Sequence, residues 1–99
     1  MDFKVIITQS ALKDLEEIVD FISHDHPRAA QRVADDLLSR VQSLSEMPRR
    51  GQAMRARPGV RRLVRNPYLI IYRIDEVAKA VNVLRFWHRA RDPKSLRLD

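Results

Sequence analysis

The first third of the chain combines a short apolar run with a helical pattern. Residues 3–8 are apolar and β-branched, which predicts a strand. Between residues 11 and 23 the apolar positions recur every three or four residues, and Ser10 is placed to cap the helix that this spacing predicts. The stripe consists of Ala11, Leu12, Leu15, Ile18, Val19 and Ile22. Phe21 lies outside the stripe, so we expect it to be available to a partner.

A second helix follows almost at once. The acidic residues of the first helix are predicted to face solvent; they are Asp14, Glu16, Glu17 and Asp20. Residues 24–27 interrupt the pattern, because the residue before a proline is driven out of the helical region whereas proline suits the first turn of a new helix. A new apolar stripe then runs to about Leu44. With so short a loop, the two helices must be antiparallel neighbours.

The second half of the chain predicts three more strands. Residues 48–59, bounded by proline at both ends, predict an extended but ordered loop. Strands are then expected at 60–65, 69–74 and 80–87, separated by turn signals. The middle one is nearly continuously apolar, as in a central strand. The tail at 89–99 is polar and is predicted to fray.

This order predicts one architecture. A β-α-α-β-β-β chain forms an α+β fold in which a helical hairpin packs on a mostly antiparallel four-stranded sheet. The last three strands form a meander, and the first strand is expected beside the last. At 99 residues the chain has room for a single domain, residues 1–99.

Composition narrows the function classes. The chain has no cysteine, which excludes disulfides and thiolate chemistry and fits a reducing compartment. It has no run of 18 apolar residues, and its first residues lack a signal-peptide pattern. We therefore expect a cytoplasmic protein without a membrane partner.

The charge is unevenly distributed. Residues 1–46 have a net charge of −4 and residues 47–99 a net charge of +10. Between Pro48 and Ile74 there is no acidic residue but eight arginines, namely Arg49, Arg50, Arg55, Arg57, Arg61, Arg62, Arg65 and Arg73. Such a field favours a polyanionic partner, either a nucleic acid or an acidic protein segment.

Few residues are placed for conventional catalysis. His24 and His26 form an H-x-H pair, but no further metal ligands are positioned with them, and we expect neither a metal nor a cofactor. With two glycines there is no phosphate-binding loop, and no serine lies in a nucleophile elbow. The segment 87–93 remains, with an aromatic ring, an imidazole and two arginines. A metal-independent ribonuclease uses such groups, arginine for phosphorane charge and histidine as general acid or base; alternatively, Trp87 simply closes the core.

These segments together resemble the ParE/RelE superfamily, the toxins of type II toxin–antitoxin systems, and most closely its ParE-like branch. The resemblance covers nearly the whole chain and implies the same fold. It is carried by the order and spacing of residues 10–18 (SALKDLEEI), 29–30 (AA), 47–51 (MPRRG), 58–63 (PGVRRL), 68–74 (YLIIYRI) and 83–93 (VLRFWHRARDP).

The superfamily implies two alternative activities. RelE-like members cut mRNA in the ribosomal A site, whereas ParE-like members poison DNA gyrase and are not nucleases. Nucleolytic members commonly carry a basic residue shortly before the tyrosine of the central strand, where this chain has Leu69. We therefore favour the gyrase poison, for which the target-binding candidates are Arg85, Trp87, His88, Arg89 and Arg91. For a ribonuclease, the catalytic candidates are Arg61, Arg62 and His88.

The resemblance also implies a partner. Such toxins are held inactive in a hetero-oligomer by a cognate antitoxin, whose acidic, initially disordered C-terminal region folds onto the toxin. Charge complementarity with the basic half of this chain would speed that encounter. The antitoxin-binding candidates are Leu15, Phe21, Arg61, Leu69 and Arg73.

Overall fold

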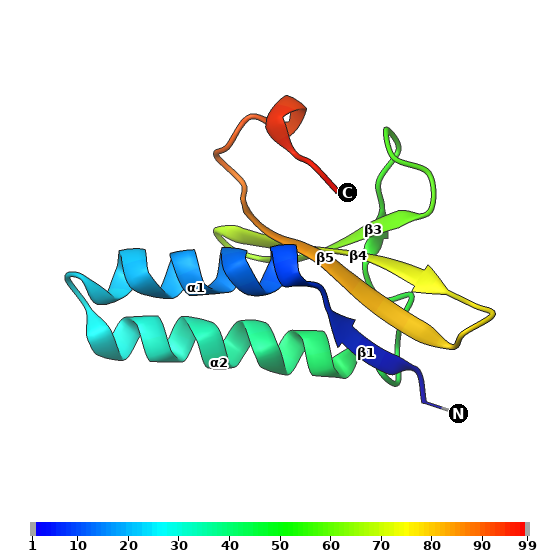
Figure 1. The fold of residues 1–99 in the computed structure, drawn as a ribbon, viewed down its shortest axis with the longest axis horizontal. Helices are drawn as coiled ribbons and strands as arrows, with labels where there is room; N and C mark the ends of the chain where they lie inside the picture. The colour runs from blue at the N-terminus through cyan, green and yellow to red at the C-terminus, as the bar shows by residue number, and fades with distance from the viewer. Residues whose placement is uncertain (1, 99) are drawn as a thin grey trace.

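The computed structural model describes residues 2–98, in which two antiparallel helices cover one face of a sheet and the C-terminal segment rises from the other (Figure 1). The elements are β1 (Lys4–Ile7), α1 (Gln9–Ser23), α2 (Pro27–Ser43), β2 (Gln52–Ala53), β3 (Val60–Arg65), β4 (Tyr68–Asp75), β5 (Ala80–His88) and a 3-10 helix, η1 (Pro93–Ser95). Within these residues no helix is both long and apolar enough to cross a membrane. Met1 and Asp99, the ends of the expected domain, lie outside the described residues.

The sheet is mixed and has the order β1-β5-β4-β3-β2. β1 lies beside β5, as expected, and runs parallel to it, whereas the other neighbours are antiparallel. The prediction of four strands was wrong. β2 pairs Gln52 with Arg62 and Ala53 with Arg61, within the segment predicted to be a loop. Two residues are too few to show a period-2 pattern, so this strand leaves no signal in the sequence.

The first helix begins two residues earlier than its sequence indicates. The cap is Thr8 and not Ser10, which lies within α1. The Thr8 hydroxyl accepts a hydrogen bond from the Ala11 amide at 3.3 Å and donates to the Val83 carbonyl at 2.8 Å. Thr8 therefore joins the end of β1, the start of α1 and the edge of β5, which Ser10 has no means of doing.

Two apolar clusters lie on opposite faces of the sheet. The larger, between sheet and helices, includes Leu15, Leu37, Ile70 and Phe86. The smaller lies on the other face and is formed by Val60, Leu69, Ile71, Trp87 and Leu96. The tail was predicted to be polar and to fray, but Leu96 is buried. Its carbonyl accepts a hydrogen bond from Arg57 at 2.8 Å. The C-terminal segment thus covers apolar surface that the helices cannot reach.

Tyr72 closes the loop that leads from the helices to β3. Its side chain is fully buried, and burial raises the pKa of its hydroxyl, which stays protonated. The hydroxyl accepts a hydrogen bond from the Gly51 amide at 2.9 Å and donates to the Pro48 carbonyl at 2.7 Å. An added Cβ at Gly51 would collide with this ring and with the Arg62 carbonyl, so the close approach requires glycine.

Replacing Tyr72 with Phe removes both hydrogen bonds and leaves two buried backbone groups unpaired. We expect Tyr72→Phe to lower the free energy of unfolding by about 1–3 kcal/mol, measured by urea denaturation. Tyr68→Phe is the matched control, because no hydrogen bond joins the Tyr68 hydroxyl to another residue within 2–98. Equal effects of the two substitutions would contradict the proposed closure.

Candidate functional site

An ion pair between a buried carboxylate and a half-buried guanidinium fixes α1 against the edge of β5. Asp14 was expected to face solvent, but its residue is only 6% exposed, so that prediction was wrong. Its carboxylate accepts two hydrogen bonds from the Arg85 guanidinium, at 2.6 and 2.9 Å, and one from the Phe86 amide at 3.1 Å. β1 pairs with β5 only as far as Val83. Beyond that point, the carboxylate of Asp14 accepts the hydrogen bond of the β5 backbone amide of Phe86, which no strand would otherwise pair.

This pair also fixes the charge of Arg85. The hydrogen bonds that the Arg85 guanidinium donates to Asp14 raise its pKa above its already high value, so it is charged at every physiological pH. The Arg85 guanidinium further donates to the Arg97 carbonyl at 2.8 Å and lies 5.2 Å from the centre of the Trp87 ring. Arg85 therefore joins α1, β5 and the C-terminal segment.

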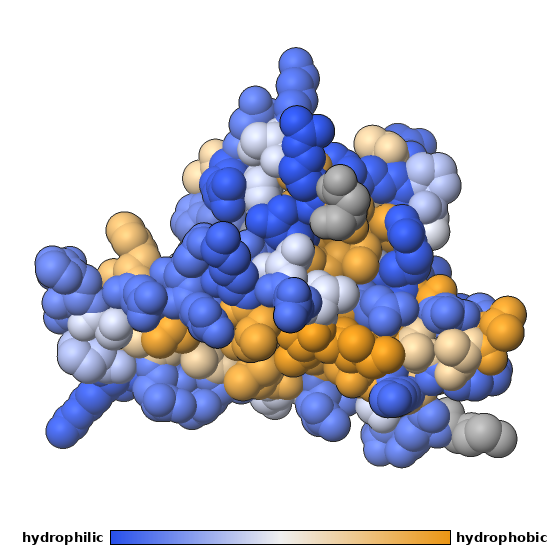
Figure 2. Space-filling view, viewed as in Figure 1, coloured by the Kyte–Doolittle hydropathy of each residue, from blue (hydrophilic) through white to orange (hydrophobic). Residues whose placement is uncertain are grey.

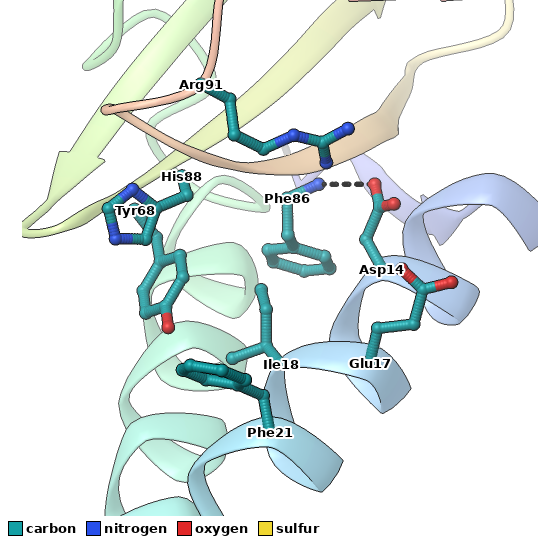
Figure 3. A pocket seen from close by; sticks show the side chains of 8 residues that line it. All are labelled: Asp14, Glu17, Ile18, Phe21, Tyr68, Phe86, His88 and Arg91. Carbon is teal, nitrogen blue, oxygen red and sulfur yellow. Dashed lines mark hydrogen bonds between the residues drawn. The ribbon is translucent and has the colours of Figure 1, made fainter.

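Next to the ion pair, α1, the start of β4 and the end of β5 line an open pocket of about 340 Å³ (Figure 3). Ile18 and Phe21 of α1 face Tyr68 and Phe86 of the sheet across it. The remaining lining residues are polar: Asp14, Glu17, His88 and Arg91. An apolar interior with a few polar groups at its rim is typical of a site that accepts a side chain or a small ligand.

Three groups at this pocket are able to donate hydrogen bonds. The Tyr68 side chain is 94% buried with its hydroxyl directed toward the helical hairpin, and burial raises its pKa. Nδ1 of His88 accepts a hydrogen bond from the Ala90 amide at 3.0 Å, so the neutral ring carries its proton on Nε2. The ring of His88 also packs edge-on against Tyr68, with centroids 5.3 Å apart. The third donor is the exposed guanidinium of Arg91.

The structure does not bring together the three ribonuclease candidates. Arg61 pairs with Tyr72 on β4, whereas His88 pairs with Tyr68, four residues away along the same strand. Arg61 on β3 and His88 on β5 are also two strand spacings apart. Together with the four residues along the strand, this separates their backbones by about 16 Å. Arg62 points to the opposite face from Arg61, since side chains alternate along a strand.

Arg61 and Arg62 are also held locally. Arg61 donates to the Gly51 carbonyl at 2.7 Å, and Arg62 donates to the Gln52 side chain at 3.3 Å. Neither guanidinium points toward His88 in this arrangement. In this structure Arg61, Arg62 and His88 thus lie at separate places on the sheet.

The target-binding candidates other than His88, which lines the pocket, fall into two groups. Trp87 is buried in the smaller cluster and Arg85 is held by Asp14, so both stabilise the fold. Arg89 and Arg91 are exposed at the exit of β5. Arg89 donates to the Asn66 side chain at 2.6 Å, and the Arg91 guanidinium lies 3.9 Å from the centre of the Trp87 ring. These contacts orient the two arginines while leaving them open to solvent.

The antitoxin-binding candidates also include both buried and accessible residues. Leu15 and Leu69 are each 8% exposed and belong to the two apolar clusters, so their side chains offer little free surface. Arg73 is exposed, and Arg61 is half-buried. Phe21 is 81% exposed at the mouth of the pocket, which makes it the most accessible of the three apolar candidates.

Several residues of this site escaped the sequence interpretation, among them Asp14, Tyr68 and Phe86. One signal was present: Asp14 lies three residues after Ala11 and four before Ile18, which places it on the apolar stripe. A carboxylate there indicates a buried partner. Nothing in the sequence indicated that Tyr68 and Phe86 lie opposite α1, because that depends on how the helix crosses the sheet.

The fold of two helices on a five-stranded mixed sheet matches that of solved RelE- and ParE-like structures. Residues 5–93 match the pattern of the family described as ParE toxin of type II toxin–antitoxin system, parDE, and the chain belongs to this family. It is 39% identical over 89 residues to Toxin RelE2 of Caulobacter vibrioides, an alignment that covers 89% of this chain and 97% of the relative. The chain is thus a type II toxin.

Solved structures of toxin–antitoxin systems share the fold. A chain of the chromosomal ParDE system from P. aeruginosa superimposes with a TM-score of 0.75 at 24% identity, covering 87% of this chain and 95% of that one. A chain of the RelBE2 complex from Mycobacterium tuberculosis gives a TM-score of 0.64 at 29% identity, covering 90% and 100%. Structural neighbours therefore carry both ParE and RelE names.

The Asp14–Arg85 pair provides a test of how α1 is held. Replacing Arg85 with Met keeps most of the side-chain volume but leaves a buried carboxylate without its cation. We expect Arg85→Met to lower the free energy of unfolding by about 3 kcal/mol. Arg40→Met is the control, since Arg40 forms a surface pair with Asp36 and its loss should cost less than about 0.5 kcal/mol. Urea denaturation that shows similar losses for both would refute the role given to Asp14.

Proposed function

We propose that this toxin poisons DNA gyrase and is neutralised by a cognate antitoxin. The antitoxin binds at the pocket between α1 and the ends of β4 and β5, named the Phe21 pocket after the exposed residue at its mouth. The observation that carries the choice of target is the separation of Arg61, Arg62 and His88. Metal-independent cleavage of RNA needs an acid–base group and a cation at one phosphate, within hydrogen-bond reach of it. Arg62 lies on the opposite face of the sheet from Arg61, and the backbones of Arg61 and His88 are about 16 Å apart, so these three residues do not meet that need.

Leu69 supports the same choice. It stands where nucleolytic relatives commonly have a basic residue, and its side chain is buried in the smaller cluster, which also contains Val60 and Trp87. A buried leucine stabilises no phosphorane charge. The activity then depends on protein contacts, for which Arg89 and Arg91 at the exit of β5 are the exposed candidates.

The antitoxin part of the proposal rests on shape and charge. Solved neighbours of this fold come from toxin–antitoxin complexes. The Phe21 pocket offers an apolar seat with Arg91 at its rim, and the acid-free arginine segment of the chain offers a field that attracts an acidic peptide. An amphipathic segment with an apolar anchor and acidic flanks fits both features.

A ribosome-dependent ribonuclease is the second candidate. It is favoured by the name of the relative Toxin RelE2, with which this chain shares 39% identity. In that case His88 contributes general acid–base catalysis, and its removal should lower mRNA cleavage by about 10²–10⁴-fold.

The two candidates are separated by incubating the purified toxin with gyrase, ATP and supercoiled plasmid. We expect linear DNA to appear after protease treatment, and we expect His88→Ala to leave its yield within about twofold, because no acid–base step is needed. The double variant Arg89→Glu, Arg91→Glu should lower the yield at least about tenfold, since charges in an interface are replaced by repulsive ones. Normal supercoiling by a toxin that still arrests growth, with growth arrest lost in His88→Ala, would replace the gyrase proposal with the ribonuclease.

The antitoxin site is tested by Phe21→Asp. Placing a carboxylate at the mouth of an apolar pocket should weaken binding of the cognate antitoxin by about 10–100-fold in calorimetry. Val77→Asp is the matched control, because Val77 is 98% exposed in the turn between β4 and β5, far from the pocket. Unchanged affinity of Phe21→Asp would remove the pocket from the antitoxin interface.

A further inference from the structure

The turn between β3 and β4 holds one of the two exposed arginines at the exit of β5. The side-chain oxygen of Asn66 accepts a hydrogen bond from Nη1 of Arg89 at 2.6 Å. The Pro67 carbonyl accepts a second one from the Arg89 backbone amide at 2.9 Å. Main chain and guanidinium of Arg89 are therefore attached to the same turn. This restricts a long side chain that otherwise samples many rotamers in solvent.

Asn66 is itself attached to the helical hairpin. Its carbonyl accepts a hydrogen bond from Nη1 of Arg65 at 2.8 Å, and Nε of Arg65 donates to Asp36 on α2 at 2.5 Å. Arg40, one turn further along α2, donates to the other carboxylate oxygen of Asp36 at 3.3 Å. A continuous set of hydrogen bonds thus runs from α2 to the guanidinium of Arg89. We name it the Asn66 network.

The bond to Asn66 leaves most of the Arg89 donors available. A guanidinium carries five N–H donors in one plane, and Asn66 takes one of the two on Nη1. Arg89 is exposed, and its side chain makes no other hydrogen bond within residues 2–98. Its Nε and Nη2 lie side by side, at a spacing that matches the two oxygens of a carboxylate. Arg89 therefore offers a fixed edge with two parallel donors.

The surroundings of Arg89 suit a single carboxylate. Figure 2 shows mainly hydrophilic side chains around the C-terminal segment, whereas an apolar band lies over the hairpin, so a partner of this end is recognised by polar contacts. The other cations of the Asn66 network, Arg40 and Arg65, both bind Asp36. The charged residues that follow Arg89 in the C-terminal segment include an acid: Arg91, Asp92, Lys94 and Arg97. A nucleic-acid backbone instead requires a row of free cations for its successive phosphates.

We propose that Asn66 is a positioning residue for target binding. It holds Arg89 so that Nε and Nη2 bind one carboxylate of the target protein through two parallel hydrogen bonds. This role rests on the proposed function, in which Arg89 belongs to the gyrase contact. Fixing the guanidinium before binding lowers the entropy that is lost on association. A planar pair of donors also selects the direction of the carboxylate, which charge alone does not do.

Binding of the purified toxin to DNA-free gyrase, measured by biolayer interferometry, tests the role of Asn66. We expect Asn66→Ala to raise the Kd about fivefold and Arg89→Ala about tenfold. In the double variant the Kd should stay within about twofold of that of Arg89→Ala, because Asn66 acts through the group that has been removed. Losses that add up in the double variant would overturn the proposal.

The matched control for these variants is Asn82→Ala. Asn82 is the other asparagine of the chain and lies near the start of β5, away from the exit of that strand. Its replacement should leave the Kd unchanged. Circular dichroism verifies that each variant is folded.

Two conservative changes separate orientation from charge. Arg89→Lys keeps the charge but loses the planar pair of donors, so we expect the Kd to rise about fivefold. Asn66→Asp keeps an oxygen acceptor for Arg89 but adds a carboxylate that competes with the target. The Kd should rise about tenfold, while urea denaturation shows no loss in the free energy of unfolding. Binding as in the wild type by either variant would overturn the bidentate contact.

The outcome for Asn66 can be separated from that for gyrase. Binding that requires DNA and falls steeply with salt would assign Arg89 to a phosphate and overturn the carboxylate contact. A toxin that arrests growth without binding gyrase would overturn the proposed function. The same variants are then compared by growth arrest at graded expression. Weaker arrest by Asn66→Ala that disappears in the Arg89→Ala background would support the positioning role, and a loss that persists there would refute it.

Discussion

The hydrogen-bonded pair of Asp14 and Arg85 is the contact on which the arrangement of this toxin depends. β1 ends before β5 does, and a free strand edge beside a helix would leave backbone groups unpaired. Asp14 satisfies the Phe86 amide and neutralises Arg85 at once. This fixes the angle at which α1 crosses the sheet. The Phe21 pocket, which lies between that helix and the strand ends, exists because the angle is fixed.

The two faces of the sheet are covered by different parts of the chain. The residues that form these two apolar clusters stabilise the fold and are distinct from the exposed residues that partners can reach. The helices cover one face, and the tail with Leu96 covers the other. Tyr72 closes the connection between the helical and sheet halves with one hydroxyl. As a result, several residues that look functional in the sequence, such as Trp87 and Leu69, are part of the apolar interior. Exposed arginines and Phe21 remain accessible to partners.

Most of the fold was predictable, because its elements are long and strongly patterned. Both helices, the central strand and the neighbouring position of the first and last strands follow from apolar spacing and loop length. The three failures have separate causes. β2 has two residues, too few for a pattern, and the cap at Thr8 is chosen by a carbonyl of β5 that is 75 residues away in the chain. Asp14 was assigned to solvent by its charge, although its position on the stripe indicated burial.

By itself, the sequence determined the class of fold, the basic character of the sheet half and membership of the ParE/RelE superfamily, because periodicity, charge and motif order are local or additive properties. Only the tertiary structure decided which of the candidate residues share a site. Strand register separated Arg61 from His88, and the alternation of side chains put Arg62 on the other face. The same packing left Phe21 exposed beside Tyr68 and buried Leu69. Such relations depend on which distant segments meet, and that is set by packing across the whole chain.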